Sequence, residues 1–440
     1  MDNKTINGLI EFIDKTPTCF HAVENFSGML DKSGFTRLFE SRKWDIKPGG
    51  KYYVCRNGST IAAFVISKKP FKSFMIAAAH SDSPSFKIKP EPEITVDNKY
   101  VKLSVEKYGG MIISSWLDRP LSIAGRAAFR TPDGVAVKNV NIDRDLVCIP
   151  NLAIHMDGGM NEGVKWNVRT HMPPLFGDYS SKGKFEELIA STAEITRDKL
   201  LGYDLFLYNR DRGKIWGVSD EYFSCPRIDD LQCAYSAITG LINTADIETE
   251  AVRAAVIFDN EEVGSGTKQG ARSTFLRDTL TRINEELGGG RSDYISALAS
   301  GFMLSADNAH AVHPNNPDKA DPNNRPYMND GVVIKYNANQ RYVTDSASEA
   351  IFKEICERRG IKYQIYSNRS DIPGGSTLGN LSNEQVALNS VDIGLAQLAM
   401  HSAYETAGSR DLDYMISAVE AFYSTELKRE FDDKYTIVSK

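Results

Sequence analysis

The sequence lacks the marks of a disulfide-stabilised or membrane-spanning protein. Its 440 residues include six widely spread cysteines, none of which forms a CxxC pair. Scattered cysteines in a long chain are typical of reduced thiols in a reducing compartment. No apolar run approaches the roughly 20 residues of a membrane span, and the opening MDNKTINGLIEFIDKTP has no apolar core of a secretory signal. We therefore expect a cytoplasmic protein with no membrane partner.

An excess of basic residues is also missing. Lys and Arg number 52 against 58 Asp and Glu, which gives a net charge of -6. Nucleic acids and anionic membranes attract proteins through a basic surface, so neither is an expected partner. Internal repeats and low-complexity tracts are absent as well. Because single cores tend to split beyond about 250–300 residues, we expect two domains.

Apolar runs predict an α/β domain made of both ends of the chain. The runs at 61–66 (IAAFVI), 74–79 (FMIAAA) and 254–258 (AAVIF) have the length and continuity of strands covered on both faces. The remaining predicted elements of this domain are helices over residues 5–32, 347–359 and 412–427 and a strand within 386–395.

The middle of the chain has a different character. Its segments, from about residue 94 to 217, are shorter, often alternate in hydrophobicity and are punctuated by glycine pairs, which predicts a β-rich insertion. We therefore expect an α/β fold. An α/β/α catalytic domain with a mixed central sheet would comprise residues 1–92 and 225–440, interrupted by a β-rich domain over residues 93–224.

A histidine and an aspartate directly follow one of the buried runs. His80 and Asp82 come immediately after FMIAAA, at the strand end where open α/β sheets place their sites. A ligating histidine commonly donates its second ring N–H to a carboxylate, and Asp82 can fill that role. A strand-end turn capped by Asp82 is the alternative.

Two pairs of adjacent carboxylates are further candidates. Glu261 and Glu262 follow AAVIF in the motif DNEEVGS. Like charges this close raise one pKa when they are buried, and a metal that neutralises one carboxylate leaves the other as a general base. A solvated charged turn is the alternative. Asp229 and Asp230, in PRIDDL, either cap the following helix or bridge two cations.

Histidines in two further motifs complete the candidates. SADNAHAVH places Asp307, His310 and His313 within seven positions, and LAMHS contains His401. By residue type alone His310 is a ligand candidate, although one histidine of such a loop is often structural or contacts substrate. His401 alone would more often be an ordinary packed residue. A mixed histidine and carboxylate set without thiolates suits zinc, manganese or cobalt, and two such ions about 3.5–4 Å apart support hydrolysis.

Eight motifs stand in a recognisable order along the chain: HSDSP, YGGMIISSWLDRPLSIAGR, NLAIH, PRIDDL, DNEEVGS, SADNAHAVHPN, GVVIKYNANQRY and LAMHS. In this order they resemble the aspartyl aminopeptidase family of metallopeptidases. The resemblance implies an enzyme that removes the N-terminal residue of peptides and prefers Asp or Glu. It also implies two divalent metal ions per subunit, zinc first and manganese or cobalt as alternatives. The inserted domain would mediate assembly, usually into a tetrahedral dodecamer.

The resemblance also implies a role for each candidate residue. Glu261 would be the general base, and Asp82 would support His80. The implied metal ligands are His80, Asp229, Glu262, Asp307 and His401, with Asp229 between the two metals. The implied substrate-binding residues are His155, His310, Lys335 and Tyr342, of which His155 would act in a neighbouring subunit's site. Lys335 would face an acidic side chain, whereas a surface lysine in a strand is the alternative from sequence alone.

Two other functions stay open at this stage. One is an aminopeptidase of the same fold that prefers neutral residues. The other is an inactive scaffold that assembles without catalysis. The complete ligand set, together with Glu261, favours an enzyme over a scaffold, and a panel of substrates distinguishes acidic from neutral preference.

Overall fold

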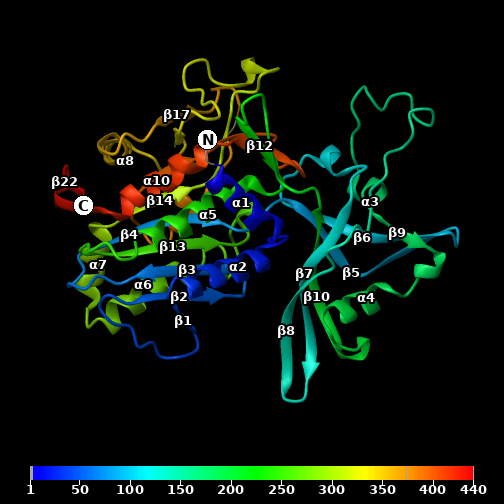
Figure 1. Ribbon diagram of the computed structural model, residues 1–440, viewed down its shortest axis with the longest axis horizontal. Helices are drawn as coiled ribbons and strands as arrows, with labels where there is room; N and C mark the ends of the chain where they lie inside the picture. Colours follow the sequence, from blue (N-terminus) through cyan, green and yellow to red (C-terminus); the bar gives the residue numbers. More distant parts are fainter. Residues whose placement is uncertain (1–2, 373, 440) are drawn as a thin grey trace.

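The computed structural model describes residues 3–372 and 374–439, and its larger part is built on a mixed sheet of nine strands (Figure 1). In spatial order these strands are β1 (Thr36–Leu38), β2 (Lys51–Arg56), β3 (Thr60–Val65), β13 (Ala251–Phe258), β4 (Ser73–His80), β14 (Phe302–Ala306), β18 (Asn389–Gly394), β16 (Val332–Tyr336) and β17 (Tyr363–Ser367). The central strands β13, β4, β14 and β18 run parallel. Their carboxyl ends therefore meet at one edge, and the predicted mixed sheet is confirmed.

Helices cover both faces of this sheet. Neighbouring residues of a strand point to opposite faces, so Ala63 and Ala77 belong to one core and Phe64 and Phe74 to the other. This two-sided burial explains the continuous apolar runs. The first core includes α1 (Lys4–Asp14), α2 (Cys19–Lys32), α5 (Ile228–Asn243), α8 (Ser346–Arg358) and α10 (Asp411–Tyr423), and the second includes α6 (Phe275–Glu286), α7 (Arg291–Ala299) and α9 (Leu378–Ser382).

A separate antiparallel sheet of six strands forms the β-rich part, on the right of Figure 1. In spatial order it contains β8 (Gly134–Asn141), β7 (Leu121–Thr131), β10 (Leu200–Asn209), β5 (Ser85–Val96), β6 (Tyr100–Tyr108) and β9 (Leu175–Asp178), and it carries the short helices α3 (Val168–His171) and α4 (Phe185–Thr192). This part has its own apolar core around Trp116 and Phe185. The predicted β-rich insertion is confirmed, and the boundaries 92/93 and 224/225 stay a prediction.

A third sheet of five strands links the two parts. Its spatial order is β11 (Lys214–Trp216), β12 (Tyr222–Cys225), β20 (Glu405–Gly408), β19 (Ala396–Leu398) and β15 (Ala309–His310). Strand β12 leads from the β-rich part into α5, and β19 and β20 flank the turn that contains His401. This sheet therefore brings residues from the middle and the end of the chain to the edge of the main sheet.

Two predicted helices differ from the observed elements. The helix expected over 5–32 is two helices, because α1 ends at Asp14 and a turn containing Pro17 precedes α2. The helix expected over 412–427 ends at Tyr423, and the chain continues as a hairpin of β21 (Thr425–Phe431) and β22 (Lys434–Ser439). Alternating burial at the start of β21 stabilises a strand there.

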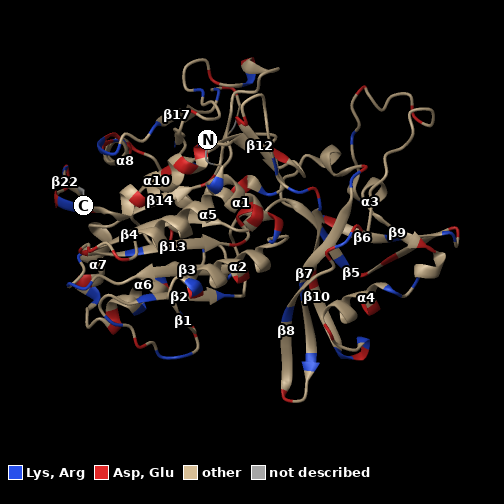
Figure 2. Ribbon diagram, in the orientation of Figure 1, with Lys and Arg blue, Asp and Glu red and all other residues tan. Residues whose placement is uncertain are grey.

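The structure also shows the state of the cysteines, the character of the helices and the distribution of charge. All six cysteines are free thiols. Among the described residues, no helix combines the length and the hydrophobicity that a membrane span needs. Basic and acidic residues are interspersed over both parts of the molecule (Figure 2).

Candidate active site

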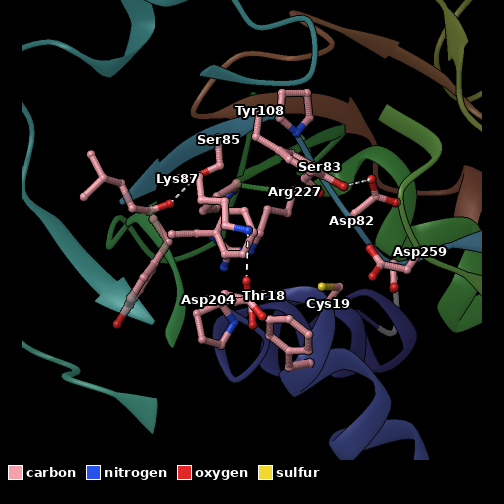
Figure 3. Close-up of a pocket in the computed structure, with 18 of the residues that line it drawn as sticks. Thr18, Cys19, Asp82, Ser83, Ser85, Lys87, Tyr108, Asp204, Arg227 and Asp259 are labelled. Carbon is pink, nitrogen blue, oxygen red and sulfur yellow. Dashed lines mark hydrogen bonds and ion pairs between the residues drawn. The ribbon is translucent and has the colours of Figure 1, made fainter. Parts of the chain in front are cut away.

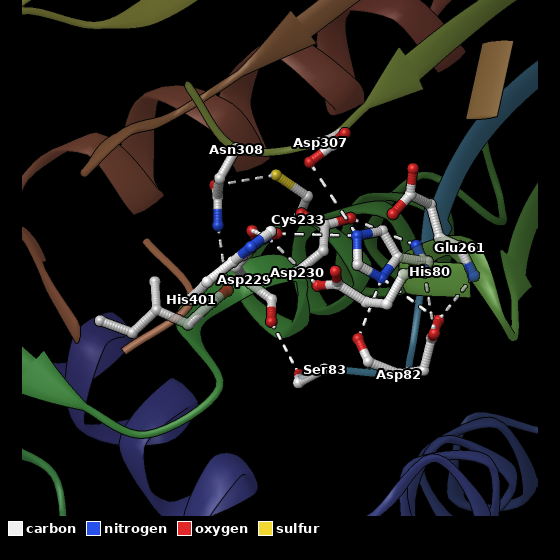
Figure 4. A network of polar contacts seen from close by, with 12 residues as sticks. His80, Asp82, Ser83, Asp229, Asp230, Cys233, Glu261, Asp307, Asn308 and His401 are labelled. Atoms are coloured by element: carbon white, nitrogen blue, oxygen red, sulfur yellow. Dashed lines mark hydrogen bonds and ion pairs between the residues drawn. The ribbon is translucent and has the colours of Figure 1, made fainter. Parts of the chain in front are cut away.

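The predicted metal ligands converge at the carboxyl edge of the main sheet. Figure 4 shows four of them, His80, Asp229, Asp307 and His401. His80 is the last residue of β4, and Asp307 directly follows β14. Glu262 lies in the short 3-10 helix at Glu261–Val263, just after β13. Asp229 lies in the first turn of α5, where its backbone angles depart from helical values. Side chains that are distant in sequence therefore meet because parallel strands end at one edge.

The Asp229 carboxylate stands between two groups of ligands. Its Oδ1 lies 3.6 Å from His80 Nε2, which is 3.9 Å from an Asp307 carboxylate oxygen. Its Oδ2 lies 3.4 Å from His401 Nε2, and the same nitrogen is 3.4 Å from Glu262 Oε1. In each group of three side chains the facing ligand atoms lie within 4.8 Å of one another. The two oxygens of one carboxylate are thus divided between two clusters.

The donor atoms of these clusters fit divalent cations. Buried polar atoms in folded proteins almost always have a hydrogen-bond partner. Within the described residues, Asp229 Oδ1 and Glu262 Oε1 are buried and receive no hydrogen bond. Carboxylate oxygens facing histidine nitrogens, with no thiolate in either group, form a set that zinc and similar ions accept. The residues present therefore fit two metal ions, one in each cluster.

Hydrogen bonds to the backbone orient both histidines. The Nδ1–H of His80 donates to the Asp82 carbonyl oxygen at 3.0 Å, and the Nδ1–H of His401 donates to the Gly110 carbonyl oxygen. These bonds leave each Nε2 lone pair free to face its cluster. The Asp82 carboxylate lies farther from His80, at 3.4 Å. Its oxygens accept the backbone N–H groups of Glu261 (3.1 Å) and Glu262 (3.2 Å) instead.

Burial and neighbouring charges shift the pKa values of the side chains in the cluster. Burial, with the charges of Asp307 and Asp82 nearby, raises the pKa of Glu261 to about 8. Burial likewise raises the pKa of Glu262 well above its usual value. Burial alone would lower the pKa of His401, but its hydrogen bond to Asp229 and the charge of Glu262 raise it to about 10. Strong pKa shifts of buried, adjacent groups are typical of functional sites.

Three of the four predicted substrate-binding residues lie near the cluster. His310 is accessible at the end of β15, with its ring edge-on to Tyr366 at 6.2 Å. Tyr342 is buried and lies under the Lys335 ammonium, which is 5.1 Å from the ring centre. Lys335 itself is buried and donates to the backbone carbonyls of Asp307 and Asn308. The surface alternative for this lysine is therefore wrong.

His155 lies elsewhere. It is exposed in the long loop between β8 and α3, which Figure 1 shows extending away from the main sheet above α3. Among the described residues, no hydrogen bond or ion pair connects it to the ligand cluster. A role for His155 in this chain's own site has no support, and its role in a neighbouring subunit stays a prediction.

Sequence reasoning missed a buried glutamate that supports the cluster. Glu405, at the start of β20, accepts the backbone N–H of Asp229 at 3.0 Å and that of His401 at 2.7 Å. It therefore fixes the backbone of two predicted ligands from behind. An isolated acidic residue four positions after His401 gives no signal of this role, because the contact depends on how β20 pairs with β12.

Comparison with known proteins identifies the family. The family model described as "Aminopeptidase I zinc metalloprotease (M18)" matches residues 12–423. The chain belongs to the M18 family. A Clostridium acetobutylicum relative, "Probable M18 family aminopeptidase 2", is 43% identical over 424 residues, which cover 94% of this chain and 98% of the relative. This M18 chain is thus a metallopeptidase, and the predicted family and enzyme class are confirmed.

Solved structures agree with this assignment. The chain in "Cryo-EM structure of the Ape4 and Nbr1 complex" superposes with a TM-score of 0.92 at 35% identity, over 95% of this chain and 85% of that one. The chain in "Structure of S. cerevesiae mApe1 dodecamer" superposes with a TM-score of 0.83 at 27% identity, over 96% of each chain. The structural similarity to these proteins therefore extends over both the main sheet and the β-rich part.

Proposed function

We propose that this M18 aminopeptidase removes N-terminal Asp or Glu residues from peptides with two divalent metal ions, zinc first, and manganese or cobalt as alternatives. The division of the Asp229 oxygens between His80 and His401 carries the two-metal proposal. One ion would be held by His80, Asp307 and Asp229, and the other by His401, Glu262 and Asp229. Cations held by these residues would supply Lewis acidity, which lowers the pKa of a bound water and favours developing negative charge on the substrate.

Glu261 is the proposed general base. Its carboxylate belongs to a group with His80 and Glu262 whose ligand atoms lie within 4.8 Å of one another. Its backbone N–H is fixed by Asp82 at 3.1 Å. From this position the Glu261 carboxylate would accept a proton from the attacking water and pass it to the leaving amine nitrogen. Glu261 would thus act as base first and as acid second.

The proposed acidic preference depends on Lys335. Its ammonium is a buried cation next to the cluster, with Tyr342 beneath it, and a carboxylate entering this pocket needs such a partner. His310, accessible beside the cluster, would orient the substrate. One observation favours neutral preference instead, because the Lys335 ammonium already donates to two carbonyl oxygens and lies 3.7 Å from the Asp307 carboxylate.

We also propose that the chain assembles through its β-rich part, into a tetrahedral dodecamer in the cytoplasm. Large apolar side chains are exposed there, including Val135 (66%), Val137 (57%) and Met156 (74%). Val135 and Val137 alternate along β8 and so share one face of that strand, and exposed apolar side chains that lie together are typical of protein interfaces. The similar S. cerevesiae mApe1 structure is that of a dodecamer. In such an assembly His155, on the same loop as Met156, would reach a neighbouring site.

The decisive experiment compares the wild-type protein with Glu261→Gln. We expect the variant to keep its metal content, measured by mass spectrometry, and to lose turnover by about 10³-fold or more, because the isosteric amide cannot accept the proton. The matched control is Glu285→Gln, at an exposed position of α6, which should keep full activity. Retained turnover in Glu261→Gln would exclude the base assignment.

A substrate panel tests the preference. Aspartyl and glutamyl substrates should be cleaved with higher kcat/KM than alanyl and leucyl substrates of the same leaving group. If the neutral substrates are faster, the neutral alternative is correct and Lys335 serves Asp307 alone. Light scattering of the same sample tests the assembly, for which a monomer would be the contrary result.

A further inference from the structure

A series of hydrogen bonds connects the β-rich part with the proposed general base. Thr267 Oγ1 and Gln269 Nε2 both donate to Asn260 Oδ1, each at 2.8 Å. Asn260 Nδ2 donates to the Tyr108 hydroxyl oxygen at 2.8 Å. The Tyr108 hydroxyl donates to Asp82 Oδ2 at 2.6 Å. Tyr108 is the last residue of β6, so a strand of the inserted sheet ends on the catalytic network.

The hydrogen bonds in this series can be oriented in only one consistent way. Asn260 Oδ1 is occupied by two donors, so the amide nitrogen is the atom that faces Tyr108. The tyrosine oxygen then accepts from Asn260, and its single proton is directed to Asp82. Hydrogen bonds linked in series polarise and strengthen one another. The Asp82 carboxylate is therefore fixed at the place where it accepts the N–H groups of Glu261 and Glu262.

We infer that Tyr108 is a positioning residue for catalysis, which holds Asp82 so that the backbone of Glu261 and Glu262 stays in its active geometry. This inference rests on the proposed role of Glu261. Tyr108 acts through Asp82 and through backbone contacts, and it does not touch the reacting atoms. The consequence is that the inserted part completes the active site of its own chain.

The residues that follow Tyr108 support the other end of the cluster. The Gly110 carbonyl oxygen accepts the Nδ1–H of His401, and the Ile112 N–H donates to the His401 carbonyl oxygen at 3.0 Å. Gly109, between Tyr108 and Gly110, packs directly on Glu262, since a Cβ added at Gly109 would lie 3.1 Å from Glu262 Cβ. The segment 108–112 therefore contacts the network of both predicted metal clusters.

The surroundings of Tyr108 allow its hydroxyl to be tested separately from its ring. The ring packs edge-on against Phe206 at 5.4 Å, within the inserted sheet. Tyr108 also lines a cavity of about 310 Å³ between the main sheet and the β-rich part, shown in Figure 3. Phenylalanine at this position keeps the ring contact and removes only the hydrogen bonds. Tyr208 lines the same cavity, and its hydroxyl donates to Asn141, away from the ligand cluster.

The test compares Tyr108→Phe with Tyr208→Phe as the matched control. Loss of a partner that orients a metal site typically costs about 10–100-fold, so Tyr108→Phe should lower kcat by about that factor with KM within about twofold. Its metal content, its melting temperature and the rate at which a chromogenic chelator removes zinc from its clusters should match those of Tyr208→Phe. Tyr208→Phe should retain the wild-type kcat.

Asn260→Ala provides a second, independent variant. It leaves the Tyr108 ring and hydroxyl in place but frees the hydroxyl to rotate away from Asp82, so kcat should fall less than in Tyr108→Phe. A kcat for Tyr108→Phe within about twofold of wild type would overturn the inference, and so would a loss of kcat that merely follows lost zinc or a lowered melting temperature. Failure of the base assignment would be recognised separately from failure of this inference, because Glu261→Gln would then retain its turnover.

Discussion

The Lys335 ammonium is held by Asp307 twice, through the backbone carbonyl oxygen at 2.8 Å and through the carboxylate at 3.7 Å. A buried cation thus fixes both the backbone and the side chain of a predicted metal ligand. The Asp307 charge and nearby groups outweigh burial and raise the pKa of Lys335, so the ammonium stays charged. Lys335 therefore supports the cluster whether or not it also binds an acidic substrate.

Lys335→Met should separate these two roles. The variant leaves the Asp307 carboxylate without its buried partner, and loss of one member of a buried ion pair destabilises a fold by roughly 3–5 kcal/mol. We expect a lower melting temperature and weaker metal binding, with the acidic preference lost in addition. Lys319→Met, at an exposed lysine, is the control. An unchanged melting temperature together with a lost preference would show that Lys335 serves the substrate only.

Asp229→Asn should weaken both metal sites together. The two oxygens face different histidines, and an amide offers neither the charge nor a second oxygen. Glu262→Gln, by contrast, changes only the cluster that contains His401. Metal content after dialysis should therefore fall by more in Asp229→Asn than in Glu262→Gln. Equal losses in the two variants would contradict the bridging role.

Gly109→Ala should reduce activity through crowding at Glu262. Gly109 has φ +74°, and a Cβ there would lie 3.1 Å from Glu262 Cβ and 3.4 Å from Pro84 Cα. Gly183→Ala is a matched control, because Gly183 has φ +81° with no atom within 4 Å of the added Cβ. Both variants bear the backbone cost of roughly 1–2 kcal/mol for a left-handed residue. Only Gly109→Ala should also lower kcat and zinc affinity, by about tenfold or more.

The stability of the metal-free protein should fall as pH rises. The Glu261 carboxyl has its pKa raised to about 8 and the His401 imidazole to about 10, so the folded chain binds more protons than the unfolded one. The loss of folding stability caused by ionising the buried Glu261 carboxyl is absent below its unfolded pKa of about 4.3 and complete above about 8. The stabilisation from His401 is complete below about 6.5 and is lost by about 10.

Melting temperatures with zinc and with a chelator check this expectation. Bound zinc would replace the proton of His401 and favour the ionised form of Glu261, so the difference between the two samples should be larger at about pH 8 than at about pH 5.5. The metal-free Glu261→Gln protein should depend less on pH, because one of the shifted groups is removed. A zinc effect that is greatest at the acidic end would contradict the proposed ligand set.

The sequence predicts the strands and the ligand types well, for a physical reason. Strands such as β4 are buried on both faces, so they form uninterrupted apolar runs, and polar residues at their ends are conspicuous. The parallel order of β13, β4 and β14 then brings His80, Glu262 and Asp307 together. To place these three residues near one another, sequence reasoning needs only the rule that parallel strands end at one edge of the sheet.

The supporting residues could not be predicted in this way. Tyr108, Gly110 and Glu405 act through contacts between different sheets, and their residue types are ordinary for the strands and turns in which they lie. Sequence alone could not distinguish Lys335 from a surface lysine, because its burial depends on the side of β16 to which it points. The start of β21 resembled a continuation of α10 because its apolar residues fit both periods over so short a segment.

The strand order of the main sheet has a consequence for folding. Strand β4 pairs with β13 and β14, which come much later in the chain, at residues 251–258 and 302–306, and such non-local pairing is slow to form. His401 joins the cluster only after β19 is in place. With the proposed ligands, a nascent chain would have no complete metal site until Asp307, after β14, has been synthesised, and no second site until His401 has followed β19. If the two-metal proposal holds, binding of the second ion would report a late stage of folding, and neither ion could act as an early nucleus for it.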